Sequence, residues 1–145
     1  MDQHFWGPSA WVYLHTIAHN YPQQPSSYKR NIYRDVFTNL KYTLPCRKCR
    51  KHWCKLLRKF PIDPFLKTRD TLTLWLFMAH DMINRRLGNG VSPHFKDVVN
   101  IYNHIRAGKK EEPEPHYRQA ALDGGSATEQ TQPREAVPSY RFKIV

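Results

Sequence analysis

The stretch from Thr68 to Gly88 reads TRDTLTLWLFMAHDMINRRLG and is the longest periodic segment of the sequence. Its apolar residues recur at helical spacing, which predicts a helix from about residue 68 or 70 to Leu87. Gly88 is suited to end it, because glycine readily adopts the left-handed conformation found after many helices.

Further helices are predicted on both sides of this segment. Amphipathic stretches cover about residues 8–20, 28–42 and 45–60 before it, and another helix starts at Ser92-Pro93 after it. Pro8 and Pro45 suit first helical positions, where a missing N–H is tolerated. No segment shows the alternation typical of a strand. The sequence therefore predicts an all-α bundle of about five helices.

The composition changes after Gly108. The last part of the chain is rich in Glu, Pro, Gln, Ser and Gly and has few large apolar residues, which is typical of disorder. A chain of 145 residues is long enough for one domain. We therefore expect one folded domain over residues 1–107 and a disordered tail over residues 108–145.

The chain is strongly basic, with a net charge of +11. Residues 109–145 hold six basic and six acidic residues, so the excess lies in the part before them. Eight Lys or Arg and no acidic residue occur between Lys41 and Lys59. Such a surface attracts anions, including nucleic acid, acidic proteins and a cofactor pyrophosphate, although most charge runs are only solvated surface.

No apolar run is long enough to span a membrane, and the N-terminus shows no secretory signal. The expected compartment is therefore the cytosol or nucleus.

Three cysteines occur within nine residues: Cys46, Cys49 and Cys54. The first two form a CxxC at the start of a predicted helix. Backbone N–H groups and the helix dipole favour a thiolate there, and the surrounding basic residues add positive charge. Since the thiolate is the attacking species in disulfide exchange, the pair suits redox chemistry.

Zinc is the main competing interpretation of the cluster. Cys46, Cys49, His52 and Cys54 are all potential ligands, but no second half-site follows at zinc-finger spacing. A zinc-stabilised basic module that binds nucleic acid or protein therefore stays open as an alternative. Cys54 lies roughly 140° around the helix from Cys49, so we expect it to be a buried spectator thiol.

Three motifs follow one another along the chain. The first comprises Trp6-Gly7-Pro8, Trp11, Leu14-His15-Thr16, Ala18 and Tyr21-Pro22. The second is Pro45-Cys46-Arg47-Lys48-Cys49-Arg50-Lys51-His52-Trp53. The third comprises Trp75, His80, Ile83, Asn84 and Leu87-Gly88. Together they resemble the motifs of the Erv/ALR family of sulfhydryl oxidases, occur in that family's order and cover residues 6 to about 106. The short chain looks most like the versions encoded by large DNA viruses, which implies host cytoplasm or virion as its location.

The resemblance implies four helices bundled around FAD, a short fifth helix and a homodimer. Cys46 would be the outer sulfur attacked by a substrate thiolate, and Cys49 would lie next to the flavin as the charge-transfer thiolate. Electrons would pass from a protein dithiol, or from a separate dithiol relay protein, through Cys46–Cys49 to FAD. Oxygen would then accept them and give hydrogen peroxide.

Ten residues would contact the cofactor according to this resemblance: Trp6, Gly7, Trp11, His15, Cys49, His52, Trp75, His80, Asn84 and Leu87. Tyr102 would replace a family aromatic residue. Taken singly, Trp11 and Trp75 also fit ordinary core positions, and His80 fits a buried core histidine. Their occurrence as an ordered set favours the cofactor interpretation.

The sequence departs from the family pattern in several places. Asp81 replaces an Asn, and Asn89 replaces a Lys that contacts the cofactor phosphates. Arg85 or Arg86 could take over that contact. The family's structural disulfide and shuttle CxxC have no counterpart, so substrate thiols or a relay protein would have to reach Cys46 directly.

Overall fold

The computed structural model describes residues 1–89 and 93–107. This part of the chain contains five α-helices, one short 3₁₀ helix and no strand. They are α1 (Gln3–His19), α2 (Ser27–Thr43), α3 (Arg47–Lys59), η1 (Asp63–Phe65), α4 (Arg69–Leu87) and α5 (Phe95–Arg106). The prediction of an all-α fold with about five helices is confirmed. The expected disordered tail, residues 108–145, and Ser92 lie outside the described residues.

Helix α1 starts earlier than predicted. The Asp2 carboxylate accepts a hydrogen bond from the His4 N–H and caps the helix at its first turn. Pro8 therefore lies inside α1, and its prediction as the first helical residue is wrong. Having no N–H, Pro8 leaves the carbonyl of His4 without its usual helical donor.

The other boundaries follow capping chemistry. Cys46 caps α3 with its own sulfur, so Pro45 precedes the helix instead of opening it. Thr68 and Thr71 form a reciprocal capping box at the start of α4. Gly88 ends α4 with φ of 74°, a left-handed conformation that glycine adopts without strain, as predicted.

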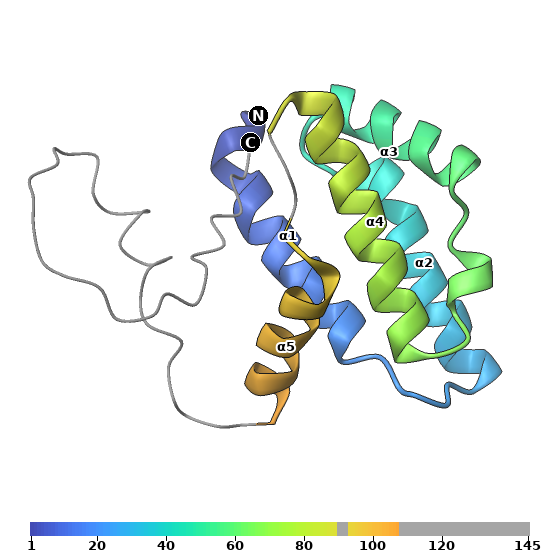
Figure 1. Cartoon of the computed structure of the whole chain (residues 1–145). Helices are drawn as coiled ribbons and strands as arrows, with labels where there is room; N and C mark the ends of the chain where they lie inside the picture. Colours follow the sequence, from blue (N-terminus) through green and yellow to red (C-terminus); the bar gives the residue numbers. More distant parts are fainter. Residues whose placement is uncertain (90–92, 108–145) are drawn as a thin grey trace, which may run out of the picture.

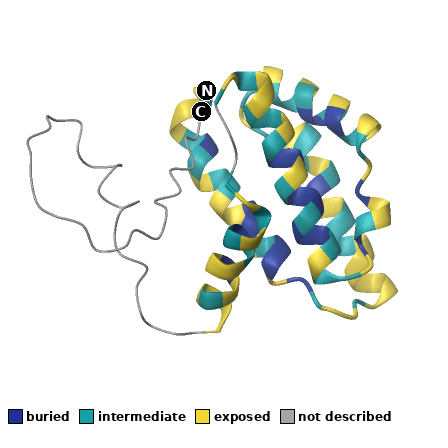
Figure 2. Cartoon of the chain, in the orientation of Figure 1, coloured by how far each residue is buried: buried dark blue, intermediate teal, exposed yellow. Residues whose placement is uncertain are grey.

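Helix α4 is the centre of the fold. In Figure 1 it runs between α1 and α5 on one side and α2 and α3 on the other. Its buried residues gather along its length in Figure 2 and include Leu72, Trp75, Leu76, Ala79 and His80. None of the described helices is both long and apolar enough to cross a bilayer.

Aromatic rings from three helices interlock in the core. The Trp75 ring of α4 meets Phe37 of α2 and Trp53 of α3 edge-on, at centroid distances of 5.5 and 6.0 Å. Trp53 donates its indole N–H to the Phe37 carbonyl, and Trp75 donates to the Phe60 carbonyl. These bonds satisfy both buried donors and hold α3 against α2 and α4.

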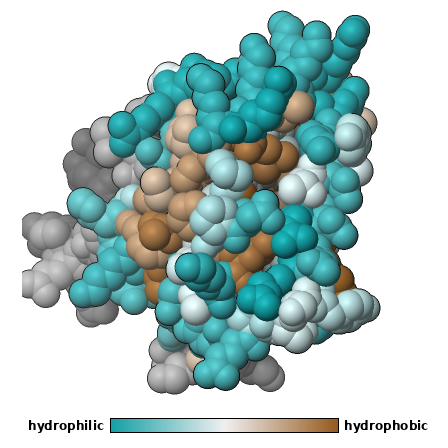
Figure 3. Space-filling view, turned by 90° about the vertical axis from the view of Figure 1, so that its right-hand side faces the viewer, coloured by the Kyte–Doolittle hydropathy of each residue, from teal (hydrophilic) through white to brown (hydrophobic). Residues whose placement is uncertain are grey.

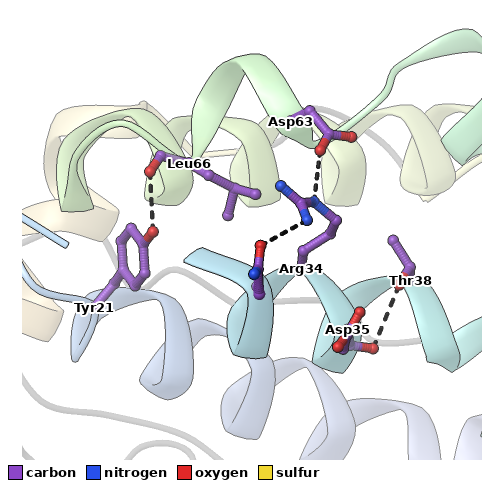
Figure 4. A network of polar contacts seen from close by, with 7 residues as sticks. Tyr21, Arg34, Asp35, Thr38, Asp63 and Leu66 are labelled. Atoms are coloured by element: carbon purple, nitrogen blue, oxygen red, sulfur yellow. Dashed lines mark hydrogen bonds and ion pairs between the residues drawn. The ribbon is translucent and has the colours of Figure 1, made fainter. Parts of the chain in front are cut away.

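Polar contacts join the loop after α1, helix α2 and the segment around η1 (Figure 4). The buried Tyr21 hydroxyl donates to the Leu66 carbonyl at 2.9 Å. Arg34 of α2 forms an ion pair with Asp63 of η1 at 2.6 Å. The ion pair is largely exposed, so we assign most of the stabilisation to the buried hydrogen bond.

We predict that Tyr21→Phe lowers the free energy of unfolding by about 1–2 kcal/mol, because it leaves the Leu66 carbonyl without its donor. Urea titration followed by tryptophan fluorescence measures the loss. Tyr28→Phe is the matched control, since Tyr28 is 71% exposed. Equal stability of the two variants would contradict the role given to the Tyr21 hydroxyl.

Candidate active site

The two cysteines of the CxxC differ in their surroundings. The Cys46 sulfur accepts a hydrogen bond from the Cys49 backbone N–H at 3.3 Å, as the N-cap of α3. The Cys49 thiol donates to the side-chain oxygen of Gln3 in α1 at 3.4 Å. Both are free thiols. The first turn of α1 thus lies against the start of α3.

These surroundings shift the pKa values of the two cysteines in opposite directions. The hydrogen bond from the Cys49 side chain, with backbone hydrogen bonds, lowers the pKa of Cys46. Burial and the neighbouring Cys46 raise the pKa of Cys49 to about 11. In the reduced pair Cys46 is therefore the more acidic thiol and loses its proton first. The protein groups around Cys49 do not by themselves favour the thiolate expected there.

Cys49 lines a small pocket between four helices, which we call the Cys49 pocket. Its volume is about 60 Å³. One wall comes from α1 and comprises Gln3, Trp6, Gly7, Ala10, Trp11 and Leu14. The remaining walls comprise Leu40, Leu44, Cys49, His52, Trp53, Ile83, Arg86 and Leu87. Cys46 is not among the lining residues, so the pocket meets one sulfur of the pair.

Trp11 joins this pocket to a buried group of histidines. Its ring stacks on the His80 imidazole with a centroid distance of 3.8 Å and an angle of 9°. His80 Nδ1 and His15 Nε2 form a hydrogen bond of 3.2 Å. The buried rings of His80 and His15 therefore lie directly behind Trp11, which lines the Cys49 pocket.

The row of rings extends to α5. His19 stacks on Tyr102 at 4.6 Å, and His15 lies 5.6 Å from the same ring. Burial lowers the pKa of both His19 and His80 to about 4. Burial also lowers the pKa of His15 well below its usual value. All three imidazoles are therefore neutral at neutral pH.

The rim of the Cys49 pocket is basic. Arg86 of α4 lies 3.0 Å from His52 Nε2 of α3, a contact in which the guanidinium donates. Burial and Arg86 lower the pKa of His52, which keeps its ring neutral. Arg85 instead pairs with Asp81 at 2.7 Å, one helical turn away. Of the two arginines considered for a phosphate contact, Arg86 is the one at the pocket.

The structure brings most of the predicted site residues together. Six line the Cys49 pocket: Trp6, Gly7, Trp11, Cys49, His52 and Leu87. His15 and His80 lie behind Trp11. Asn84 is half-buried on α4 between His80 and Leu87, and does not line the pocket. Trp75 is fully buried in the core, where it contacts Trp53 and not the pocket.

Several pocket and histidine-row residues were not predicted: Gln3, Trp53, Ile83 and His19. Helical spacing offered a signal for all four. Gln3 lies one turn before Trp6 and Gly7, and Trp53 lies one turn after Cys49. Ile83 lies one turn after His80, and His19 one turn after His15.

The possible zinc ligands do not converge. Among the residues that the structure describes, no three His, Cys, Asp or Glu side chains form a group that could hold a metal ion. His52 faces Arg86, and Cys54 lies near the Arg58 guanidinium at 3.7 Å. Cys54 does not line the Cys49 pocket, so it lies apart from the CxxC as expected, but it is only half-buried and the expectation of a buried thiol is wrong.

The neutral histidines predict a pH dependence of stability. A depressed pKa means that the unfolded chain binds protons that the folded chain does not, between about pH 6.5 and about pH 4. Stability should therefore fall as the pH falls through this window. From pH 7 to 5 we expect a loss on the order of 2 kcal/mol or more in urea titrations.

Removal of one of these groups tests the cause. His19→Phe keeps a ring against Tyr102 but cannot titrate. This variant should therefore lose less of its free energy of unfolding between pH 7 and pH 5 than the unaltered chain. His4→Phe, at an exposed position, should behave like the unaltered chain. A pH dependence that His19→Phe leaves unchanged would contradict the assignment.

Known proteins have similar sequences. Residues 8–103 match the Erv1/Alr family. The chain is 33% identical over 111 residues to a protein of Acanthamoeba polyphaga mimivirus named probable FAD-linked sulfhydryl oxidase, an alignment covering 76% of this chain and 78% of that protein. It is 32% identical over 87 residues to the FAD-linked sulfhydryl oxidase ERV1 of Arabidopsis thaliana, covering 60% of this chain and 44% of the plant protein. The match thus spans less than half of the plant relative.

Solved structures show the same fold. The FAD-binding domain of Erv1 from Saccharomyces cerevisiae superposes with a TM-score of 0.65 at 25% identity, covering 70% of this chain and 94% of that domain. The yeast Erv1 core gives a TM-score of 0.60 at 27% identity, covering 72% and 83% of the two chains. With a family match over residues 8–103 and the same helical fold, the chain belongs to the Erv1/Alr family.

Proposed function

We propose that the protein is an FAD-dependent thiol oxidase that forms disulfide bonds in protein substrates. One observation carries the proposal: the CxxC has one sulfur, Cys49, in a pocket walled by aromatic rings, and the other, Cys46, outside it. Family membership and relatives named FAD-linked sulfhydryl oxidases support the same function.

The residues that line the Cys49 pocket match the chemistry of a flavin. Trp6 and Trp11 offer flat surfaces, and the Trp6 indole N–H is buried with no hydrogen-bond partner among the described residues. A buried donor without a partner is unfavourable, and a polar heterocycle could satisfy it. Arg86 supplies a cation for the phosphates.

The size of the pocket limits how a flavin enters. At about 60 Å³ it is far smaller than usual ligand pockets of roughly 300 Å³ or more. Side chains at its rim must therefore move. Arg86 is exposed and Gln3 half-buried, so both can do so with little loss of packing.

We assign the ten predicted residues to this cofactor in two groups. Trp6, Gly7, Trp11, Cys49, His52 and Leu87 would contact it directly, as lining residues. His15, His80, Asn84 and Trp75 would hold those walls in place, or make contact once the rim has moved. When bound, FAD accepts two electrons from a thiol pair and passes them on.

The cysteines would work as an exchange pair. A substrate thiolate attacks the Cys46 sulfur of the oxidised pair, the Cys46–Cys49 bond breaks, and Cys49 leaves as a thiolate. The second thiolate of the substrate then attacks the substrate sulfur that is bonded to Cys46, and Cys46 is released. The substrate gains a disulfide, and the pair gains two electrons. These electrons would leave through Cys49, which lines the pocket.

The final acceptor and the substrates complete the proposal. We infer that oxygen takes the two electrons and two protons and gives hydrogen peroxide. Protein dithiols, or a relay protein carrying a dithiol, would supply them at Cys46. The relatives from mimivirus and an iridescent virus support host cytoplasm or virion as the location.

We predict that the purified chain shows flavin absorption in the visible range and consumes oxygen with dithiothreitol. Cys46→Ser and Cys49→Ser should each lower turnover by at least about 10³-fold, because neither leaves an exchangeable disulfide, while FAD stays bound. Cys54→Ser is the matched control and should change turnover little. A folded chain that takes up no FAD would refute the proposal.

We also propose that the chain forms a homodimer through α1. Phe5, Val12 and Tyr13 lie on one face of this helix and are 84%, 53% and 66% exposed. Such a stripe of large apolar residues marks a protein interface. The same helix lines the Cys49 pocket on its other side, so the two roles use different faces.

Substitution on the exposed face tests the dimer. Val12→Arg should give a monomer in sedimentation velocity, since it places a charge in the interface. Val36→Arg, at an exposed apolar position of α2, should keep the mass of the unaltered chain. A monomeric unaltered chain would refute the dimer without affecting the oxidase.

A further inference from the structure

Helix α3 lines a second pocket on a different face, which we call the basic pocket. Its volume is about 360 Å³, and its lining is Lys41, Tyr42, Arg47, Arg50, Lys51 and Cys54. Four of these six side chains are cations. The pocket lies between the end of α2 and the first two turns of α3.

These cations lack acidic partners in the described part of the chain. The ion pairs found there involve Arg34 with Asp63 and Arg85 with Asp81, and none uses the basic residues between Lys41 and Lys59. Figure 3 shows the side of the molecule that carries α2 and α3, with hydrophilic residues over its upper part. The pocket therefore holds a concentrated positive charge that an anion can neutralise.

Two internal contacts shape the pocket. Arg50 donates to the Leu44 carbonyl and so fixes the link between α2 and α3. The Lys41 ammonium lies over the Tyr42 ring, 4.9 Å from its centre. One face of the only aromatic ring in the lining is thus covered, which disfavours the base stacking typical of single-stranded nucleic acid.

One end of the basic pocket lies next to Cys46 in the sequence. Arg47 directly follows Cys46, and Cys54 lies eight residues beyond Cys46 on the same helix. That separation corresponds to about 12 Å along the axis. An extended peptide covers it with about four residues. A chain whose cysteine sits at Cys46 can therefore place its next few residues in the basic pocket.

We propose that the basic pocket binds an acidic segment next to the reactive cysteine of the substrate protein. This rests on the proposed oxidase function and adds a substrate class to it. Carboxylates at successive positions of the segment would meet Lys41, Arg47 and Lys51. The attraction would hold the substrate thiolate near the Cys46 sulfur, which acts mainly on the rate of encounter.

The test uses the full chain with FAD and two synthetic peptides. Both carry one CxxC, followed by four Asp or Glu in the first peptide and by four Asn or Gln in the second. Oxygen consumption gives kcat/KM for each. We expect the acidic peptide to be favoured by at least about tenfold at low salt. The preference should fall toward one near 0.5 M salt, where the Debye length is only a few ångströms.

Charge removal locates the effect. Lys41→Gln combined with Lys51→Gln should bring the ratio of the two kcat/KM values close to one. Lys55→Gln combined with Lys59→Gln removes the same charge from outside the lining and should keep the preference. Equal losses in the two double variants would mean that net charge, and not this pocket, is responsible, and would overturn the proposal.

A binding measurement separates this proposal from the oxidase itself. Fluorescent versions of both peptides with serine in place of cysteine report affinity without turnover. Tighter binding of the acidic peptide supports the pocket even if dithiothreitol oxidation fails, which would refute only the oxidase. Equal binding and equal oxidation of the two peptides overturns the pocket. The proposal is also overturned if a single-stranded oligonucleotide binds tightly and displaces the acidic peptide, and if this binding is lost in the Lys41/Lys51 double variant.

Discussion

The stacking of Trp11 on His80 is the contact on which the site depends. It joins α1 to α4 at a centroid distance of 3.8 Å, and Trp11 also meets Trp53 of α3 edge-on at 6.2 Å. One side chain thereby fixes three helices around the Cys49 pocket. His80 can occupy this position because burial lowers the pKa of its imidazole to about 4 and so keeps the ring neutral. A charged imidazole there would face a large desolvation cost.

The two functions that we propose for α3 follow from helical geometry. Residues 49, 52 and 53 face the bundle and line the Cys49 pocket, whereas residues 47, 50, 51 and 54 face outward and line the basic pocket. The inner set carries one Cys, one His and one Trp, and the outer set is mostly cationic. The same thirteen-residue helix thus presents an apolar redox face and a charged face on opposite sides.

Much of this could be predicted from sequence, because helical periodicity and caps are local signals. All five helices were predicted, and Gly88 ended α4 as expected. The start of α1 was missed because proline marks a helix start only when no better cap precedes it, and Asp2 does. The inward turn of Trp75 toward the Phe60 carbonyl, and the pairing of Arg85 with Asp81, depend on three-dimensional packing. Sequence alone could not decide them.

In the exchange that we propose, access and acidity favour different sulfurs of the CxxC, and this conflict would give Arg86 a role. A disulfide breaks faster when the departing sulfur has the lower pKa, which would favour attack on Cys49 with Cys46 leaving. Cys49 lies in the pocket behind Gln3, however, so an incoming protein thiolate meets Cys46 first. Cys49 must then leave as a thiolate in a site where burial opposes its charge. Arg86 lowers the Cys49 pKa and lines the same pocket, so it offsets part of that cost at the sulfur that needs it.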